Sequence, residues 1–332
     1  MKIAFYSTKS YDREFMDRAN ESFRHDISYF DTALTPQTVV LAQDHEAVCI
    51  FVNDEANAEV LDKLKEVGVR LVALRSAGFN NVDLRHAQKI DMPVVRVPAY
   101  SPYAVAEHAL AMLLTLNRKT HLAYERVRHG NFSLERLMGF DLHSKTVGVI
   151  GTGKIGRIFA RMMRGLGCTI VAYDPYPNED FAQEDGIEYV SFDELLDRSA
   201  IVSLHCPLTE ESYHLINAEA VERMQDNVML INTSRGALVD TPAVIKGLKS
   251  RKIGYFGLDV YEQEENLFFE DLSGEIIQDD QITRLMTFPN VLITSHQAFF
   301  TSNALTQIAE TTLHNIADFE AGKPLDNQVG VD

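Results

Sequence analysis

The segment Gly151-Thr-Gly-Lys-Ile-Gly156 is the feature that most constrains the fold of this 332-residue chain. A Gly-x-Gly-x-x-Gly pattern alone is weak, but this one follows an apolar run at residues 146–150 that is typical of a buried strand. It also opens a helical pattern of apolar residues at 158–163. A second apolar run, 168–173, follows and ends at Asp174. This order predicts a strand, tight turn, helix and strand of a doubly wound α/β sheet.

Such a unit is suited to binding a dinucleotide. Its glycines allow the backbone to approach a pyrophosphate, and the helix start offers unpaired N–H groups and the positive end of a dipole. Asp174 can accept hydrogen bonds from a ribose 2′-OH and would repel a 2′-phosphate, so NAD is favoured over NADP. An ordinary strand–helix turn is the alternative. The expected cofactor-binding residues here are Gly151, Gly153, Lys154, Ile155, Gly156 and Asp174.

Strand-like runs alternate with helical patterns along the chain, which favours parallel sheets covered by helices. The predicted strands lie at residues 3–6, 27–30, 47–52, 71–74, 94–97, 146–150, 168–173, 201–205, 228–232, 255–260 and 291–294. Because the glycine motif lies in mid-chain, we expect two doubly wound parallel-sheet domains. A Rossmann NAD domain, 101–298, would be inserted into a flavodoxin-like substrate domain made of 1–100 and 299–332.

The composition excludes several classes of function. The net charge is −17 without a basic run, which does not favour a nucleic-acid surface. Cys49, Cys168 and Cys206 lie far apart in apolar runs, as reduced core thiols do, and predict neither disulfides nor a metal site. The longest apolar stretch, 104–116, is too short to span a bilayer, and the first residues lead directly into a strand without a signal peptide. We therefore expect a cytoplasmic protein without membrane, nucleic-acid or metal partners.

Three polar residues follow strand ends in the second half of the chain: Arg235, Glu264 and His296. Ligands of open α/β sheets bind beyond these ends. A guanidinium can clamp a carboxylate, and an imidazole can exchange a proton while a hydride moves. A carboxylate beside the imidazole stabilises its protonated form. The set predicts reduction of a carbonyl in an anionic substrate, although Arg235 alone could form a structural ion pair and His296 alone could be a core or surface residue.

At these residues the chain resembles the D-2-hydroxyacid dehydrogenases, over essentially its full length. The matching stretches are residues 151–156, 204–209, 232–237, 259–264 and 295–298. The resemblance implies that Arg235 clamps the substrate and that His296 is the acid–base with Glu264 as its partner.

The resemblance also assigns further contacts. In the stretch 75–79, the backbone amides of Ala77 and Gly78 would bind the substrate carboxylate, and glycine permits close approach there. The further residues implied to contact the cofactor are Cys206, Pro207, Thr233 and Asp259, the last at the nicotinamide carboxamide.

Two departures from the family pattern indicate the branch that forms lactate. Ser295 precedes His296 where relatives commonly have proline, and Glu265 follows Glu264 where many have proline. With the stretch 266–270, they weaken the phosphoglycerate and formate alternatives. The wider acidic segment 262–280 would be an excursion at the edge of the active site or a solvated loop.

The resemblance implies NADH-dependent reduction of pyruvate to D-lactate by two domains that close on the substrate. Tyr100, Phe299 and Phe51 would crowd the pocket and favour pyruvate over longer 2-oxo acids, unless they are ordinary hydrophobic contacts. The alternatives are a reductase of bulkier 2-oxo acids and an NAD-sensing regulatory protein on the same scaffold. The helix at 102–117 has apolar residues on too many faces for a solvated helix, so we expect it to pack between subunits of a homo-oligomer, a dimer or tetramer.

Overall fold

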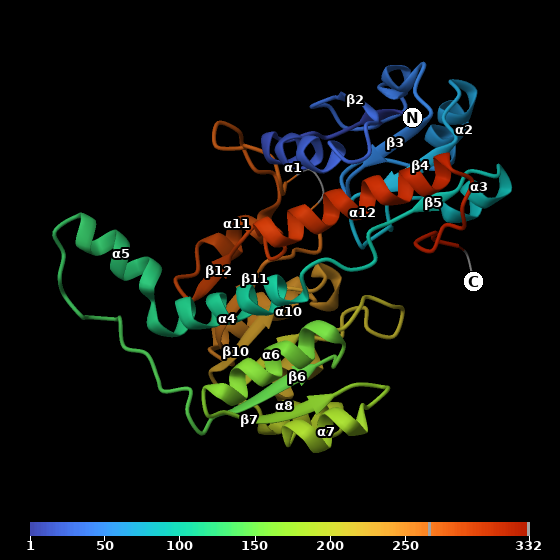
Figure 1. Ribbon diagram of the computed structural model, residues 1–332. Coiled ribbons are helices and arrows are strands. Elements are labelled where there is room, and N and C mark those ends of the chain that lie inside the picture. The colour runs from blue at the N-terminus through green and yellow to red at the C-terminus, as the bar shows by residue number, and fades with distance from the viewer. Residues whose placement is uncertain (265–266, 331–332) are drawn as a thin grey trace. The chain divides into compact units, whose positions relative to one another are not determined.

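A computed structural model describes residues 1–264 and 267–330 of the chain (Figure 1). The contacts divide it into two compact units. Unit 1 consists of Met1–Ser101 and the chain from Phe300 onward, and unit 2 is Pro102–Phe299.

Unit 1 contains a five-stranded parallel sheet in the order β2-β1-β3-β4-β5. This is the strand order of flavodoxin-like folds. The strands are β1 (Lys2–Phe5), β2 (Asp26–Tyr29), β3 (Ala47–Ile50), β4 (Leu71–Leu74) and β5 (Val94–Val95). The helices are α1 (Ser10–Asn20), α2 (Ala58–Glu66), α3 (Leu84–Lys89) and α12 (Ser302–Glu320), with a 3₁₀ turn, η1, at Val39–Ala42.

Unit 2 contains a seven-stranded parallel sheet in the order β12-β11-β10-β9-β6-β7-β8, the Rossmann order with one more strand. The strands are β6 (Thr146–Ile150), β7 (Thr169–Tyr173), β8 (Glu188–Tyr189), β9 (Ile201–Leu204), β10 (Val228–Asn232), β11 (Ile253–Leu258) and β12 (Val291–Ile293). The helices are α4 (Pro102–Arg118), α5 (Thr120–Arg128), α6 (Lys154–Gly165), α7 (Glu179–Asp185), α8 (Phe192–Arg198), α9 (Ala218–Arg223), α10 (Thr241–Ser250) and α11 (Asp280–Met286), with a 3₁₀ turn, η2, at Gly236–Leu238. The strand order reverses between β6 and β9, which is where such sheets bind ligands. The predicted pair of doubly wound parallel sheets is confirmed.

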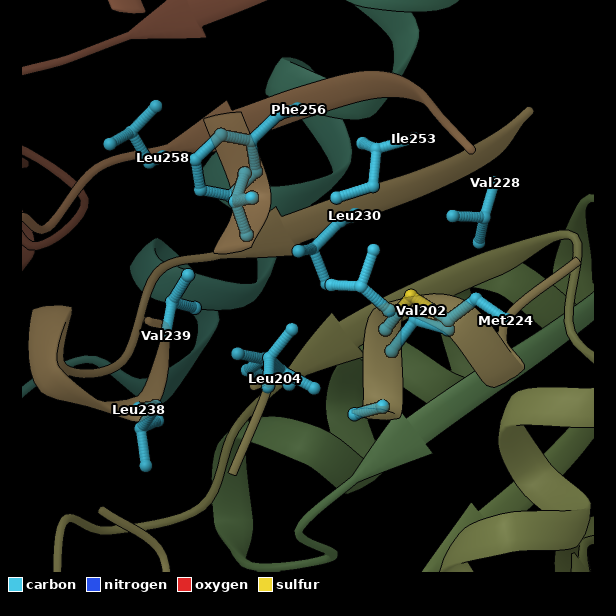
Figure 2. Close-up of a cluster of buried hydrophobic side chains, with 14 of the residues drawn as sticks. Val202, Leu204, Met224, Val228, Leu230, Leu238, Val239, Ile253, Phe256 and Leu258 are labelled. Atoms are coloured by element: carbon cyan, nitrogen blue, oxygen red, sulfur yellow. The ribbon is translucent and has the colours of Figure 1, made fainter. Parts of the chain in front are cut away.

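The sheet of unit 2 is buried on both faces. Alternate residues of β10 point to opposite sides: Leu230 joins one core cluster, whereas Met229 and Ile231 join another. Figure 2 shows the first cluster, in which Leu230 lies near Val202 of β9. This two-sided packing makes the strands a rigid base for the loops that follow their carboxyl ends.

Strand β8 is absent from the strands expected from the sequence. It has only two residues, Glu188 and Tyr189, and neither is buried. A pair of polar and aromatic residues carries no periodic apolar signal, so only its pairing with β7 identifies it as a strand.

The apolar residues of α4 are explained within unit 2. The helix packs on α6 and on the sheet, and Ala106, Ala109, Leu113 and Leu116 belong to a buried cluster with β6 and β10 residues. Tyr103 and Leu114 of the same helix remain exposed, so the expectation that it packs between subunits stays a prediction. In contrast, α5 has no buried residue, and the segment from α5 to β6 leaves the body of the unit before returning (Figure 1).

Within the 262–280 segment, residues 267–269 are anchored to unit 2, whereas most of residues 270–276 are exposed. Phe268 is buried, and Leu267 and Phe269 pack against the same cluster. The solvated-loop alternative therefore does not apply to these residues. Among the described residues, no helix is long and apolar enough to cross a membrane.

Candidate functional site

His296 lies in a tight turn directly after β12. Its φ of 54° is in the left-handed region, which residues other than glycine seldom adopt. Asp259, which follows β11, holds this turn: its carbonyl oxygen accepts from the His296 amide at 2.6 Å. Its carboxylate accepts from the amides of Gln297 at 2.9 Å and Ala298 at 2.8 Å. These bonds fix the backbone from which the imidazole projects.

The structure brings His296 and Glu264 together. Nδ1 of His296 lies 2.8 Å from Oε1 of Glu264, and Oε2 of Glu264 accepts from the Tyr261 amide at 3.0 Å. The side chains are 22% and 28% exposed, so a small ligand can reach them. Because the carboxylate faces Nδ1, the other ring nitrogen, Nε2, is left to exchange a proton. Nε2 has no hydrogen-bond partner among the residues that the structure describes.

Two other acidic residues were conceivable partners of His296. Glu262 is engaged elsewhere, since its Oε1 lies 2.6 Å from Nε2 of His214. Glu265 lies outside the described residues, as does Asn266. Glu264 is thus the carboxylate that the described structure pairs with this imidazole.

Arg235 follows β10 at the start of η2. Its Nη1 donates to the Ser234 carbonyl at 2.7 Å, and Asn232 Nδ2 donates to the Arg235 carbonyl at 2.9 Å. A Cβ at Gly236 would lie 2.0 Å from the carbonyl carbon of Tyr261, so glycine is required for this loop to contact the Glu264 loop. No carboxylate of the described chain lies within ion-pair distance of the guanidinium. The structural ion pair considered for Arg235 is therefore not seen there.

Asp259 is completely buried, and its carboxylate is surrounded by hydrogen-bond donors. Besides the two amides, its Oδ1 accepts from Thr294 Oγ1 at 2.5 Å and lies 3.3 Å from His108 Nε2. Burial opposes ionisation, but the hydrogen bonds from His108 and Thr294 outweigh it and lower the pKa of Asp259. Neither partner is predicted from the sequence, although a polar His108 within an apolar helix is a signal.

The glycine motif forms the expected cradle at the switch point. Gly151 has a φ of 91°, and a Cβ there would lie 2.6 Å from the Cys206 amide nitrogen, so this turn and the loop after β9 approach closely only with glycine. A Cβ at Gly156 would lie 2.0 Å from the Gly151 carbonyl oxygen. Gly153 caps α6 without a side-chain hydrogen bond, which leaves the first amides of this helix for an anion.

Asp174 is held at the end of β7. Its Oδ2 accepts from the Thr152 amide at 2.7 Å and from Thr152 Oγ1 at 2.9 Å, and its Oδ1 accepts from the Tyr176 amide at 2.9 Å. Tyr189 of β8 donates to Thr152 Oγ1 at 2.8 Å. Thr152 and Tyr176 orient the half-buried carboxylate, and Tyr189 supports Thr152; none of these contacts is predicted from the sequence.

Thr233 and Cys206 are two further residues that are expected to contact the cofactor. Thr233 Oγ1 is buried and has no hydrogen-bond partner among the described residues, which leaves it able to bond a ligand. Burial raises the pKa of the Cys206 thiol to about 11, so this residue is a neutral neighbour, and Pro207 follows it. The glycine cradle, the open helix end and the unpaired Thr233 hydroxyl together fit a dinucleotide.

In unit 1, the loop that the resemblance assigns to carboxylate binding follows β4. The amides of Ala77 and Gly78 have no acceptor among the described residues. Phe51 has structural contacts: its amide donates to Asp54 at 2.6 Å, and the Arg75 guanidinium lies 4.8 Å from its ring centre. Tyr100 is half-buried in unit 1, and Phe299 is buried in unit 2.

The described residues contain no group of three or more His, Cys, Asp or Glu side chains that could hold a metal ion. All three cysteines are free.

Residues 110–298 match the family model described as "D-isomer specific 2-hydroxyacid dehydrogenase, NAD binding domain". The chain belongs to this family. It is 55% identical to a "2-hydroxyacid dehydrogenase homolog" of Haemophilus influenzae, with 99% of each chain covered. It is 53% identical to the D-lactate dehydrogenase of Escherichia coli, with 99% of this chain and 100% of that one covered.

Among solved structures, the apo-structure of D-lactate dehydrogenase from Escherichia coli superposes with a TM-score of 0.92 at 50% identity, covering 99% of this chain and 100% of that one. The family membership makes the chain an NAD-dependent 2-hydroxyacid dehydrogenase, and the predicted cofactor, NAD, is confirmed.

Proposed function

We propose that this dehydrogenase reduces pyruvate to D-lactate with NADH and catalyses the reverse oxidation. One observation carries the proposal: Nδ1 of His296 lies 2.8 Å from Oε1 of Glu264, and the loop of Glu264 contacts the loop of Arg235, whose guanidinium has no carboxylate partner in the described chain. An imidazole whose Nε2 is free in the described chain, together with a guanidinium that forms no ion pair there, suits a small substrate with a carboxylate next to a carbonyl. The name of the Escherichia coli relative, D-lactate dehydrogenase, supports pyruvate as the substrate.

In the proposed reaction, residues of the chain bind the substrate carboxylate, polarise the carbonyl group and protonate the carbonyl oxygen. Arg235 and the amides of Ala77 and Gly78 bind the substrate carboxylate, and Arg235 also draws electron density from the neighbouring carbonyl. NADH, when bound, supplies the hydride that adds to the carbonyl carbon. Protonated His296 donates its Nε2 proton to the carbonyl oxygen, which completes the alcohol and leaves a neutral imidazole. Glu264 stabilises the imidazolium before this transfer.

We further propose how the cofactor is held. The amides of Lys154, Ile155 and Gly156 bind the pyrophosphate, and Asp174 accepts from the ribose hydroxyls. The other residues proposed to line the cofactor are Cys206, Pro207, Thr233 and Asp259. Oδ2 of Asp259 accepts only from the Ala298 amide within the described chain, which leaves room for a carboxamide N–H.

Replacing Asp174 with alanine should reduce the preference for NADH over NADPH. Two lost hydrogen bonds, each worth about 1 to 3 kcal/mol, weaken NADH binding, while repulsion of the 2′-phosphate disappears. Steady-state kinetics with each cofactor measure the ratio, and Asp180→Ala, an exposed acid of α7, is the control. A wild-type preference for NADPH, or an unchanged ratio in Asp174→Ala, would reject this role.

Replacing Glu264 with glutamine should lower the turnover of pyruvate reduction. Glutamine can still hydrogen-bond Nδ1 of His296, but it carries no charge to compensate the imidazolium that donates the proton. Steady-state kcat with pyruvate and NADH measures the loss. Glu262→Gln, which alters a carboxylate paired with His214, should leave kcat unchanged.

A panel of 2-oxo acids tests the substrate proposal. We expect NADH oxidation with pyruvate to exceed that with branched or phenyl 2-oxo acids, since Tyr100, Phe299 and Phe51 are proposed to limit the pocket. Faster turnover of a bulky substrate would favour the alternative reductase. No turnover of any 2-oxo acid, with NADH still bound, would favour the NAD-sensing protein.

We also propose that the protein is a cytoplasmic homo-oligomer, a dimer or tetramer. Its free cysteines are typical of a reducing compartment.

Several large apolar side chains on and after α5 are exposed, namely Tyr124, Val127, Phe132, Leu134 and Met138. Large exposed apolar surfaces are uncommon on monomers, and a second copy of the chain would cover these side chains. Light scattering would measure the mass, and a monomer at micromolar concentration would contradict the proposal.

A further inference from the structure

Two backbone N–H groups in unit 1 are available to donate hydrogen bonds to an anion. Within the loop after β4, the N–H groups of Ala77 and Gly78 lack acceptors in the described chain. The loop itself is closed by Ser76, whose Oγ donates to the Gly78 carbonyl at 2.8 Å. The two free donors are therefore adjacent and belong to a defined turn.

Each of these two amides belongs to a peptide group whose carbonyl oxygen also forms a hydrogen bond. The donors to these two carbonyl oxygens come from the neighbouring residues Arg96 and Val97. The carbonyl of Ser76, which shares a peptide with the Ala77 amide, accepts from the Val97 amide at 3.1 Å. The carbonyl of Ala77, which shares a peptide with the Gly78 amide, accepts from Arg96 Nη1 at 2.8 Å. The second bond is charge-assisted, and such bonds are roughly twice as strong as neutral ones.

Hydrogen bonds to its backbone amide and carbonyl hold Arg96 in place. Its amide donates to the Asn327 carbonyl at 3.1 Å, and its carbonyl accepts from Asn315 Nδ2 of α12 at 2.9 Å. Asn327 Nδ2 donates to Asn315 Oδ1 at 2.8 Å, which ties these two supports together. The guanidinium carbon lies 5.0 Å from the ring centre of Phe79, at the far end of the loop.

The guanidinium of Arg96 has no carboxylate within ion-pair distance in the described chain, although the protein carries a net charge of −17. Arg75, which begins the same loop, differs in this respect because Asp12 Oδ1 lies 3.5 Å from its Nε. Arg96 therefore places an uncompensated positive charge at the Ala77 carbonyl, which shares a peptide with the free Gly78 amide.

We infer that Arg96 is a positioning residue for the substrate: its guanidinium polarises the Ala77–Gly78 peptide and so strengthens the Gly78 N–H as a donor to the substrate carboxylate. Hydrogen bonds that share a peptide polarise one another, by roughly 10–30% per bond. The positive charge adds a direct attraction for an anion, and half-burial of Arg96 limits its screening. The inference rests on the proposed function, in which these amides bind a 2-oxo acid.

The test compares Arg96→Gln and Arg96→Lys with Arg85→Gln, which removes an exposed arginine of α3. Arg96→Gln should raise the KM for pyruvate and the Kd for oxamate roughly tenfold, equivalent to about 1.4 kcal/mol. The kcat, the NADH affinity and the melting temperature should change little, because the carboxylate does not react. Arg96→Lys should recover part of the loss, since lysine keeps the charge but not the planar fork. Methyl pyruvate, which lacks the carboxylate charge, should be reduced equally well by wild type and Arg96→Gln.

Three outcomes would overturn the inference. The first is an unchanged KM and oxamate Kd in Arg96→Gln, with an active wild type, which would leave the proposed function intact. The second is a joint loss of melting temperature, NADH affinity and kcat, which would make Arg96 a structural residue. The third is an equal loss with pyruvate and methyl pyruvate. A wild type that turns over no 2-oxo acid would instead reject the proposed function itself.

Discussion

Replacement of His296 by glutamine should lower the rate of pyruvate reduction roughly 10²- to 10⁴-fold, the usual contribution of a general acid. Glutamine cannot donate a proton at a useful rate, whereas His296 has its Nε2 free and its Nδ1 paired with Glu264 at 2.8 Å. The turn should persist, because it is held by backbone amides of residues 296–298 that bind Asp259. Single-turnover measurements of NADH absorbance would report the reactive step directly.

The NADH affinity of His296→Gln, measured by fluorescence titration, should equal that of the wild type. His296→Asn is a second variant, since asparagine readily adopts the positive φ found at this position. If both variants kept wild-type turnover, His296 would not be the acid. If both lost NADH binding as well as turnover, the effect would come from disruption of the turn.

The change Arg235→Lys should weaken pyruvate and oxamate binding by roughly 10- to 100-fold. Lysine keeps the charge but loses the planar pair of donors that can grip a carboxylate, and charge-assisted hydrogen bonds contribute about 1.5 to 3 kcal/mol. The guanidinium has no acidic partner in the described chain, so its replacement breaks no internal ion pair. Steady-state kinetics and oxamate titration in the presence of NADH would measure the loss.

NADH affinity and melting temperature should stay close to wild type in Arg235→Lys. Arg251→Lys, which changes an exposed arginine after α10, is the control and should leave the kinetics unaltered. Unaltered pyruvate and oxamate binding in Arg235→Lys itself would assign Arg235 a structural role.

The sequence by itself determined the class of fold and the order of the functional groups. Buried parallel strands read as continuous apolar runs, and the Gly151–Gly156 motif needs positive φ and close backbone approach, so both leave local signals. Arg235, Glu264 and His296 could be singled out because each follows a strand end, where parallel sheets bind ligands. Strand β8 left no such signal, and periodicity alone does not say which surface covers the apolar faces of α4.

Only the tertiary structure decided how the functional groups are held. His108 lies 186 residues from Thr294 in sequence yet 3.0 Å from its hydroxyl, and together they lower the pKa of Asp259 beneath the His296 turn. Arg96 reaches the Ala77 carbonyl across 19 residues, and α12 fixes Arg96 from more than two hundred residues away. Such bonds depend on which strand ends and helices the fold places side by side. Local periodicity indicates which face of a segment is buried, but not which residues form hydrogen bonds with it. These contacts could therefore not be predicted from the sequence.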